Sequence, residues 1–161
     1  MIGAVIKAVL GNLPVLLFAA AFLAAGFRPG PGPFAERLLS WLLLLSVGAQ
    51  GIWAGFFHVF FPGIAAASIG WQASPFQTEI GIADASIGVA AVVSFWRGLD
   101  FKAAVVWTIT LFNVGVAIVH LRDALLGDTS VNNFGPLLGI TIALAVLLPW
   151  LLTRVRGHRL G

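Results

Sequence analysis

The sequence predicts an all-α, polytopic membrane helix bundle that forms a single domain with five transmembrane helices. The first observation behind this prediction is composition: 60% of the 161 residues are hydrophobic and 9% are charged, whereas about a quarter are charged in soluble domains. The mean hydropathy is +1.02. The second observation is that long apolar segments alternate with short breaks rich in Pro, Gly or charge. The third is that the basic residues gather in particular breaks, which predicts an orientation.

Five of the apolar segments are long enough to cross roughly 30 Å of hydrocarbon at about 1.5 Å per residue. Alternating Pro and Gly over residues 29–33 must end the first helix. The third helix has the best start signal, because Ser74 can cap it, Pro75 suits its first position and Gln77 completes a capping box. Segment 62–73 is too short to cross and is expected at the interface. The expected helices span about residues 2–27, 37–61, 75–96, 101–126 and 136–153.

The basic residues predict which side of the membrane each end occupies. With five crossings, the breaks after the first and third helices share one side with the C-terminal tail. The positive-inside rule makes that side cytoplasmic, so the N-terminus is expected outside and the C-terminus inside. Seven of the nine basic residues lie in or beside these segments: Arg28, Arg37, Arg97, Lys102, Arg154, Arg156 and Arg159.

The composition also excludes several kinds of site. The absence of cysteine excludes disulfides, thiolate nucleophiles, iron–sulfur clusters and cysteine-type zinc sites. The pI near 10.7 does not predict nucleic-acid binding, because the basic residues follow the membrane-flanking segments and do not form one face with interleaved aromatics. No motif indicates an enzyme, and the sequence leaves that question open.

Three ionisable residues from different helices are expected at the same depth in the outer leaflet. His58 lies about one turn before the outer end of the second helix, and Glu79 lies about one turn inside the third. His120 lies about two turns before the outer end of the fourth helix. Ionisable groups at such depth are costly and are functional candidates. Two histidines and a carboxylate could bind a transition metal, and the two histidines alone could be axial ligands of haem b.

Further polar residues share faces with these candidates. On the second helix, Gly51 and Gly55 have the GxxxG spacing that permits close helix packing, and they share a face with His58. We expect the remaining polar residues to surround the site or to form a polar path beside it: Gln77, Asp84, Asn113 and Asp123.

Three interpretations of these residues stay open. They could only fasten helices together, through the pairs His58–Glu79 and His120–Asp123; they could bind a metal or haem; or they could line a path for protons or a small ligand. The corresponding functions are a membrane protein with an outer-leaflet metal or haem pocket, a non-catalytic accessory or scaffold subunit of a larger membrane complex, and a small proton-coupled transporter. The expected partners are the lipid bilayer and a homo-oligomer or larger complex.

One series of residues resembles a known family. The series runs from His58 through Pro62, Gly70-Trp71, Ser74-Pro75-Phe76-Gln77 and Glu79 to His120, Asn133 and Gly135. It resembles a family of small bacterial multi-pass membrane proteins of unknown function, over about residues 45–140. The resemblance implies a bacterial cytoplasmic (inner) membrane location and makes the His and Glu residues part of the family pattern, but it names no substrate.

Overall fold

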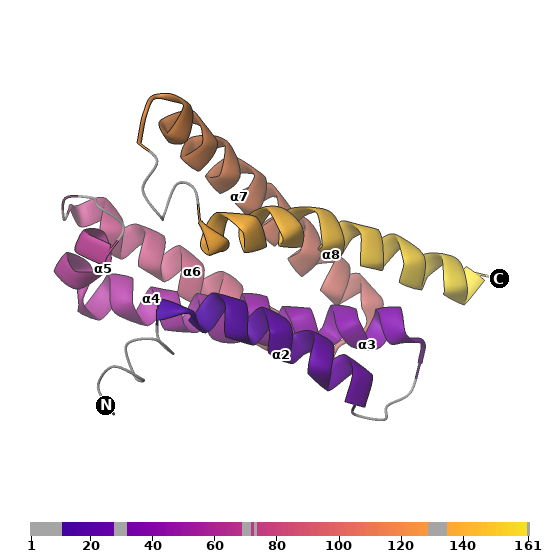
Figure 1. The fold of residues 1–161 in the computed structure, drawn as a ribbon. Helices are drawn as coiled ribbons and strands as arrows, with labels where there is room; N and C mark the ends of the chain where they lie inside the picture. The colour runs from indigo at the N-terminus through magenta and orange to yellow at the C-terminus, as the bar shows by residue number, and fades with distance from the viewer. Residues whose placement is uncertain (1–10, 28–31, 69–71, 73, 129–134, 161) are drawn as a thin grey trace.

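The computed structural model describes residues 11–27, 32–68, 72, 74–128 and 135–160, and every regular element in these ranges is a helix (Figure 1). Four helices are long and apolar enough to cross a membrane, at Phe34–Phe60, Pro75–Ser94, Leu99–Leu125 and Pro136–His158. These helices indicate a multi-pass membrane protein. The elements in order are α2 (Leu13–Phe27), α3 (Phe34–Trp41), η1 (Leu42–Ala49), α4 (Gln50–Phe60), α5 (Pro62–Ser68), α6 (Pro75–Ser94), α7 (Leu99–Leu125) and α8 (Pro136–Leu160).

The helix bounds agree with the expected ones to within a few residues, except at two places. Of the expected first helix, α2 covers Leu13–Phe27, and residues 2–10 lie outside the described part. The last helix does not end near residue 153 but continues to Leu160. Its basic extension remains helical because Arg is a good helix former.

The second long helix contains an unexpected segment. α3, η1 and α4 form one continuous helix, and η1 within it is π-helical over eight residues. π-Helical turns inside α-helices are rare and occur frequently at functional sites. No local pattern predicts this change, because Leu42–Ala49 is a uniformly apolar run apart from Ser46.

The third helix begins where the sequence predicted, but its capping box is not formed. Pro75 is the first residue of α6 and the extended Ser74 precedes it, without a side-chain capping hydrogen bond. The prediction of a capping box was therefore wrong. The Gln77 side chain is hydrogen-bonded to another helix instead.

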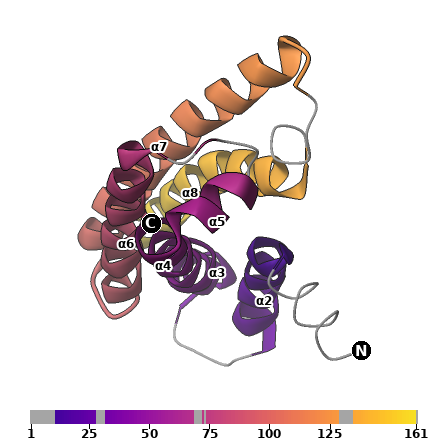
Figure 2. The same ribbon diagram turned by 90° about the vertical axis from the view of Figure 1, so that its left-hand side faces the viewer.

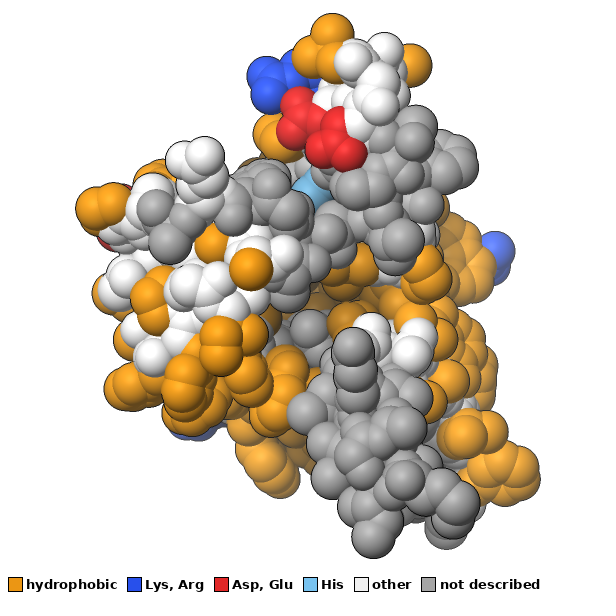
Figure 3. All heavy atoms as spheres, turned by 60° about the vertical axis from the view of Figure 1, so that its left-hand side comes forward, with side chains coloured by type: hydrophobic (Ala, Val, Ile, Leu, Met, Phe, Trp, Pro, Cys, Tyr) orange, Lys and Arg blue, Asp and Glu red, His pale blue; other side chains and the backbone are white. Residues whose placement is uncertain are grey.

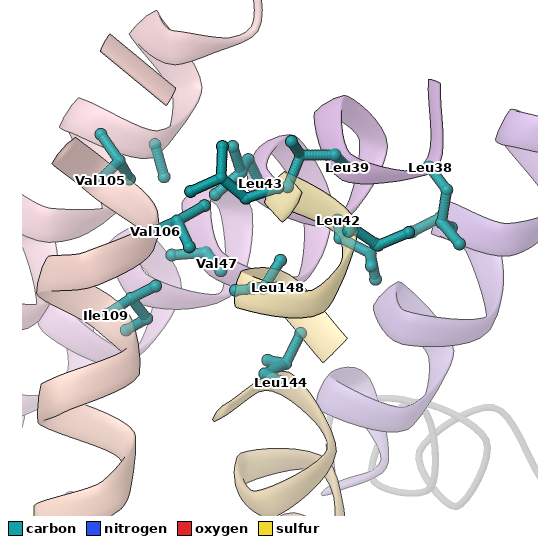
Figure 4. Packing of buried hydrophobic residues seen from close by; sticks show 14 of the residues in the cluster. Leu38, Leu39, Leu42, Leu43, Val47, Val105, Val106, Ile109, Leu144 and Leu148 are labelled. Carbon is teal, nitrogen blue, oxygen red and sulfur yellow. The ribbon is translucent and has the colours of Figure 1, made fainter. Parts of the chain in front are cut away.

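One half of the bundle has a closely packed aliphatic core. Figure 4 shows side chains from η1 and its flanking helix, the first half of α7 and the middle of α8 meeting in this core. In Figure 1 this half carries the C-terminal ends of α2 and α8 and the turn between α6 and α7. The core seals that half of the bundle. We call it the aliphatic seal, and its central members are Leu39, Leu42, Leu43, Val106, Leu148 and Leu151.

Small residues bring α4 and α6 into backbone contact. A Cβ atom added at Gly55 would lie 2.6 Å from the carbonyl oxygen of Gly81 and 2.7 Å from the Cβ of Ala85. A Cβ added at Gly51 would lie 2.8 Å from the carbonyl oxygen of Asp84. Only glycine permits this approach, as the GxxxG spacing predicted. The contact places Asp84 beside the middle of the second long helix.

Two basic side chains tie helix ends together near the aliphatic seal. Lys102 is buried, and its Nζ donates to the carbonyl oxygens of Phe95 (3.2 Å) and Arg97 (2.7 Å) at the end of α6. Arg37 donates from Nε to the carbonyl oxygen of Ala25, at 3.1 Å, at the end of α2. Both contacts put positive charge at a helix C-terminus, where the helix dipole favours it.

Candidate functional site

The other half of the bundle contains a cavity of about 600 Å³. η1, α4, α6, α7 and α8 all line it, and Pro14 of α2 contributes to its wall. It exists because α7 packs mainly on α8, and the C-terminal end of α7 stands away from α4 and α6 (Figure 2). Figure 3 shows the hollowed surface between these parts, with a histidine side chain visible in it. The polar residues that line the cavity are Ser46, Gln50, His58, Gln77, Asp84, Asn113, His120 and Thr141.

One face of the second long helix supplies a row of polar groups. Ser46, Gln50 and His58 line the cavity together with Ala54, so that cavity-lining residues follow one another at steps of four. Residues four apart share one face of a helix. The row runs from the aliphatic seal to the open end of the cavity.

His58 and Gln77 join α4 to α6 beside the cavity. The side-chain amide of Gln77, which is buried, donates from Nε2 to His58 Nδ1 at 2.5 Å. An Nδ1 atom that accepts a hydrogen bond carries no proton, so a neutral His58 ring has its proton on Nε2. A metal-bound histidine needs the reverse, with the ring nitrogen away from the metal donating its proton. In this arrangement the neutral His58 ring has one hydrogen-bond donor, at Nε2.

Glu79 is not brought together with the two histidines. Its side chain is exposed and does not line the cavity, whereas His58 and His120 both do. Within the described ranges, no three side chains of His, Cys, Asp or Glu meet in a way that could hold a metal ion. The expected three-ligand set is therefore not assembled. Glu79 follows Gln77 by two residues, which turns it by about 200° to the opposite side of α6.

The polar residues expected around the site divide into two groups. Gln77, Asp84 and Asn113 line the cavity, as expected. Asp123 does not, and it forms an ion pair with its neighbour Arg122 at 3.1 Å on the surface. The expected helix-fastening pairs are not seen either, because His58 is bound to Gln77 and the carboxylate of Asp123 is bound to Arg122.

Several polar atoms at the cavity have no partner in the part of the chain that the structure describes. Ser46 Oγ, Gln50 Oε1 and Asn113 Nδ2 are buried without a hydrogen bond. Ser46 and Asn113 are only 6% and 8% exposed. The partly buried Asp84 lines the same cavity and forms no hydrogen bond or ion pair with a described residue. An unsatisfied buried polar group costs about 1–3 kcal/mol, so such a group requires an explanation.

Sequence reasoning missed Ser46, Gln50 and Thr141. A signal for the first two was present, because Ser46 and Gln50 precede His58 by twelve and eight residues in an otherwise apolar helix. Multiples of four keep side chains near one face. Thr141 had no comparable signal, since it stands alone among apolar residues of α8.

Comparison with known proteins places the chain in a family but assigns no activity. No curated protein and no solved structure matches it. The model of one family of unknown function matches residues 11–160, a range that includes all the described residues that line the cavity. The resemblance found in the sequence is confirmed to the extent that such a family covers the chain, while Gly70, Trp71 and Asn133 of the resembling series lie outside the described residues. The chain belongs to this family of unknown function (DUF6790).

Proposed function

We propose that this membrane protein binds a small polar ligand in the cavity between η1, α4, α6, α7 and α8. One observation carries the proposal: the buried, unpartnered polar atoms of Ser46, Gln50 and Asn113 belong to side chains that line the same cavity. A ligand with matching hydrogen-bonding groups would satisfy them. Helix fastening alone does not account for them, because fastening requires that polar groups bind one another.

The size and the walls of the cavity support this proposal. Ligand pockets are typically about 300–1,000 Å³, mostly apolar, with a few polar groups that fix orientation. This cavity has a volume of about 600 Å³, and most of its lining residues are apolar. The cavity is therefore of the kind that encloses a molecule of several heavy atoms.

The orientation that we propose has five crossings, the N-terminus outside and the C-terminus in the cytoplasm of a bacterial cell. The positions of Arg97, Lys102, Arg154 and Arg156 at the sealed half of the bundle support it through the positive-inside rule. In this orientation the cavity belongs to the outer half of the membrane. A binding protein needs access to the cavity only from the outer side. A transporter would also need the side chains of the aliphatic seal to separate, so that the cavity opened toward the cytoplasm.

Transition-metal or haem b binding is a second candidate, because His58 and His120 line one cavity. Metal ligation by His58 through Nε2 would require the Gln77 amide to turn, so that its Oε1 accepts the Nδ1 proton. Metal analysis and a visible spectrum of the purified protein test this candidate. Stoichiometric metal or a Soret band would place it ahead of the polar ligand.

Single-cysteine labelling tests the proposed cavity, and the chain suits it because it contains no cysteine. Ala54 lines the cavity, whereas Ala91 is fully buried in the aliphatic core. We expect the Ala54→Cys variant in intact cells or right-side-out vesicles to react with a small membrane-impermeant thiosulfonate. The matched Ala91→Cys variant should not react.

Two results of this labelling would contradict the proposal. If Ala54→Cys is no more reactive than Ala91→Cys from either side, no polar molecule reaches the cavity and the binding function fails. If Ala54→Cys reacts only from the cytoplasmic side, the cavity is accessible but the proposed orientation is reversed.

A further inference from the structure

We infer that the ligand is a small protonated organic amine with an apolar body, an inference that rests on the proposed function and specifies its ligand class. The first support is the charge of the cavity. Among the residues that the structure describes, Asp84 is the only acidic residue that lines the cavity, and no described Lys or Arg does so. The chain as a whole has a formal net charge of +3. The described charged side chain in the cavity wall is therefore acidic, whereas the chain as a whole is basic.

The two basic side chains of α7 bind elsewhere and do not pair with Asp84. On α7, Lys102 donates to the carbonyl oxygens of Phe95 and Arg97, and Arg122 pairs with Asp123. Asp84 makes no ion pair with any residue in the described ranges. A carboxylate inside a membrane protein is usually paired or part of a ligand path. A cationic ligand would provide the missing partner.

Unpartnered acceptor atoms lie on the helix that packs against Asp84. The backbone of Asp84 contacts Gly51, and the neighbouring residue Gln50 has a buried Oε1 without a donor. Ser46, whose Oγ is also unpartnered among the described residues, precedes Gln50 by four residues on the same helix. Carboxylate and amide oxygens accept hydrogen bonds, so together they match a group with several N–H donors, such as an ammonium. Asn113 Nδ2 is an unpartnered amide donor among the described residues, and it would bind an acceptor elsewhere on the ligand.

The rest of the lining favours an organic cation over a metal cation. Calcium takes six to eight oxygen ligands and magnesium keeps several waters, and the described side chains form no metal-binding cluster. Apolar side chains supply most of the wall instead, among them Phe76, Ile80 and Phe112. Aromatic faces also attract organic cations. The combination of one carboxylate and apolar walls suits an ammonium group attached to a hydrocarbon body.

The inference is tested by binding of three probes that share a shape and differ in charge. Isothermal titration of the purified full-length protein in detergent would use 2-phenylethylamine, 2-phenylethanol and 3-phenylpropionate near pH 7, where the amine is a cation and the carboxylate an anion. We expect the amine to bind best and the anion not to bind. Asp84→Asn should weaken amine binding by about tenfold to a hundredfold, because a hydrogen bond to a charged group is worth about 1.5–3 kcal/mol.

Glu79→Gln is the matched control, because Glu79 is an acid on the same helix that does not line the cavity. It should leave amine binding unchanged, and Asp84→Glu should retain part of it. If Asp84→Asn does not fold, a second readout replaces it. This readout compares how fast a cationic and an anionic thiosulfonate label a single cysteine. We expect the cationic reagent to be favoured more strongly at Ala54→Cys, in the cavity, than at the surface control Asp128→Cys.

The outcomes separate this inference from the proposed function. If 2-phenylethanol binds as tightly as the amine, or if Asp84→Asn binds the amine like the wild type, the amine inference is overturned while ligand binding stands. If the amine does not bind at millimolar concentration, the inference is also overturned. In that case the labelling of Ala54→Cys decides whether the cavity still serves another ligand.

Discussion

The side chains of His58 and Gln77 connect α4 to α6 through a single hydrogen bond at the edge of the cavity. Gln77 Nε2 lies 2.5 Å from His58 Nδ1, and the Gln77 side chain is 3% exposed. The same two helices are in backbone contact, where a Cβ added at Gly81 would lie 2.6 Å from the Cβ of His58. His58 is therefore held both by a hydrogen bond and by a tight helix contact, which fixes the direction of its ring.

A double-mutant cycle tests the bond between these two residues. We expect His58→Ala and Gln77→Ala to be non-additive in the free energy of unfolding. The coupling should be about 0.6 kcal/mol, and at most about 1.7 kcal/mol, as for interhelical hydrogen bonds in other membrane proteins. Steric trapping or detergent unfolding measures it. Strictly additive effects would show that the two side chains do not interact.

Gly55→Ala tests the backbone contact between α4 and α6. The new Cβ would lie 2.6 Å from the carbonyl oxygen of Gly81, which cannot move without its helix. We expect a loss of about 1–3 kcal/mol in unfolding free energy, typical of an overpacked site. Gly139→Ala is the control, because nothing lies within 4 Å of its added Cβ. That variant should be unchanged or more stable by up to about 1 kcal/mol. Equal effects at the two positions would contradict the packing.

Asn113→Leu should change stability and ligand binding in opposite directions. It removes a buried amide whose Nδ2 has no described partner and replaces it with an apolar group of similar size. The ligand-depleted protein should gain about 1 kcal/mol or more, whereas ligand binding should fall. Thermal unfolding measures the first effect, and native mass spectrometry of the ligand that the protein carries from cell membranes measures the second.

Thr110→Val provides the comparison for this prediction. Thr110 Oγ1 is also buried and unpartnered among the described residues, but Thr110 does not line the cavity. The valine variant should be at least as stable as the wild type and should bind ligand normally. If Asn113→Leu destabilises the protein strongly, Asn113 has a structural partner and does not serve a ligand.

The sequence predicted the helices and the close packing well, because both depend on local patterns. Apolar length predicted five spans, and the described residues contain four helices long and apolar enough to cross a membrane. Ser74-Pro75 predicted the start of α6, and the spacing of Gly51 and Gly55 predicted the contact with another helix. Each of these signals lies within a few consecutive residues. Their physical basis, hydrocarbon thickness and helix geometry, does not depend on the rest of the fold.

The candidate site was predicted less well, because the depth of a residue in the membrane does not determine which way its side chain points from the helix. His58, Glu79 and His120 were grouped by depth, but Glu79 faces away from the cavity that the two histidines line. Gln77 and Asp84 are seven residues apart, which places them on one face of α6, and both line the cavity. The same rule applied to Glu79 would have excluded it.

Two features of the site depend on neighbouring helices and could not be read from a local pattern. The Gln77 amide binds His58 in place of its expected capping role, because α4 lies within reach of it. The cavity is open because the C-terminal end of α7 lies away from α6, and it lies there because α7 packs mainly against α8. Both are consequences of tertiary packing.

Native mass spectrometry of the wild-type protein, released from nanodiscs made directly from cell membranes, tests ligand binding most directly. We predict a species heavier than the polypeptide by one small molecule, and we predict that Asn113→Leu reduces this species while Thr110→Val retains it. When the bound molecule is released from the protein by collisional activation, its own mass should identify it. A wild-type spectrum that shows only the polypeptide and lipids, equally present in Asn113→Leu, would contradict the proposal that this cavity holds a ligand.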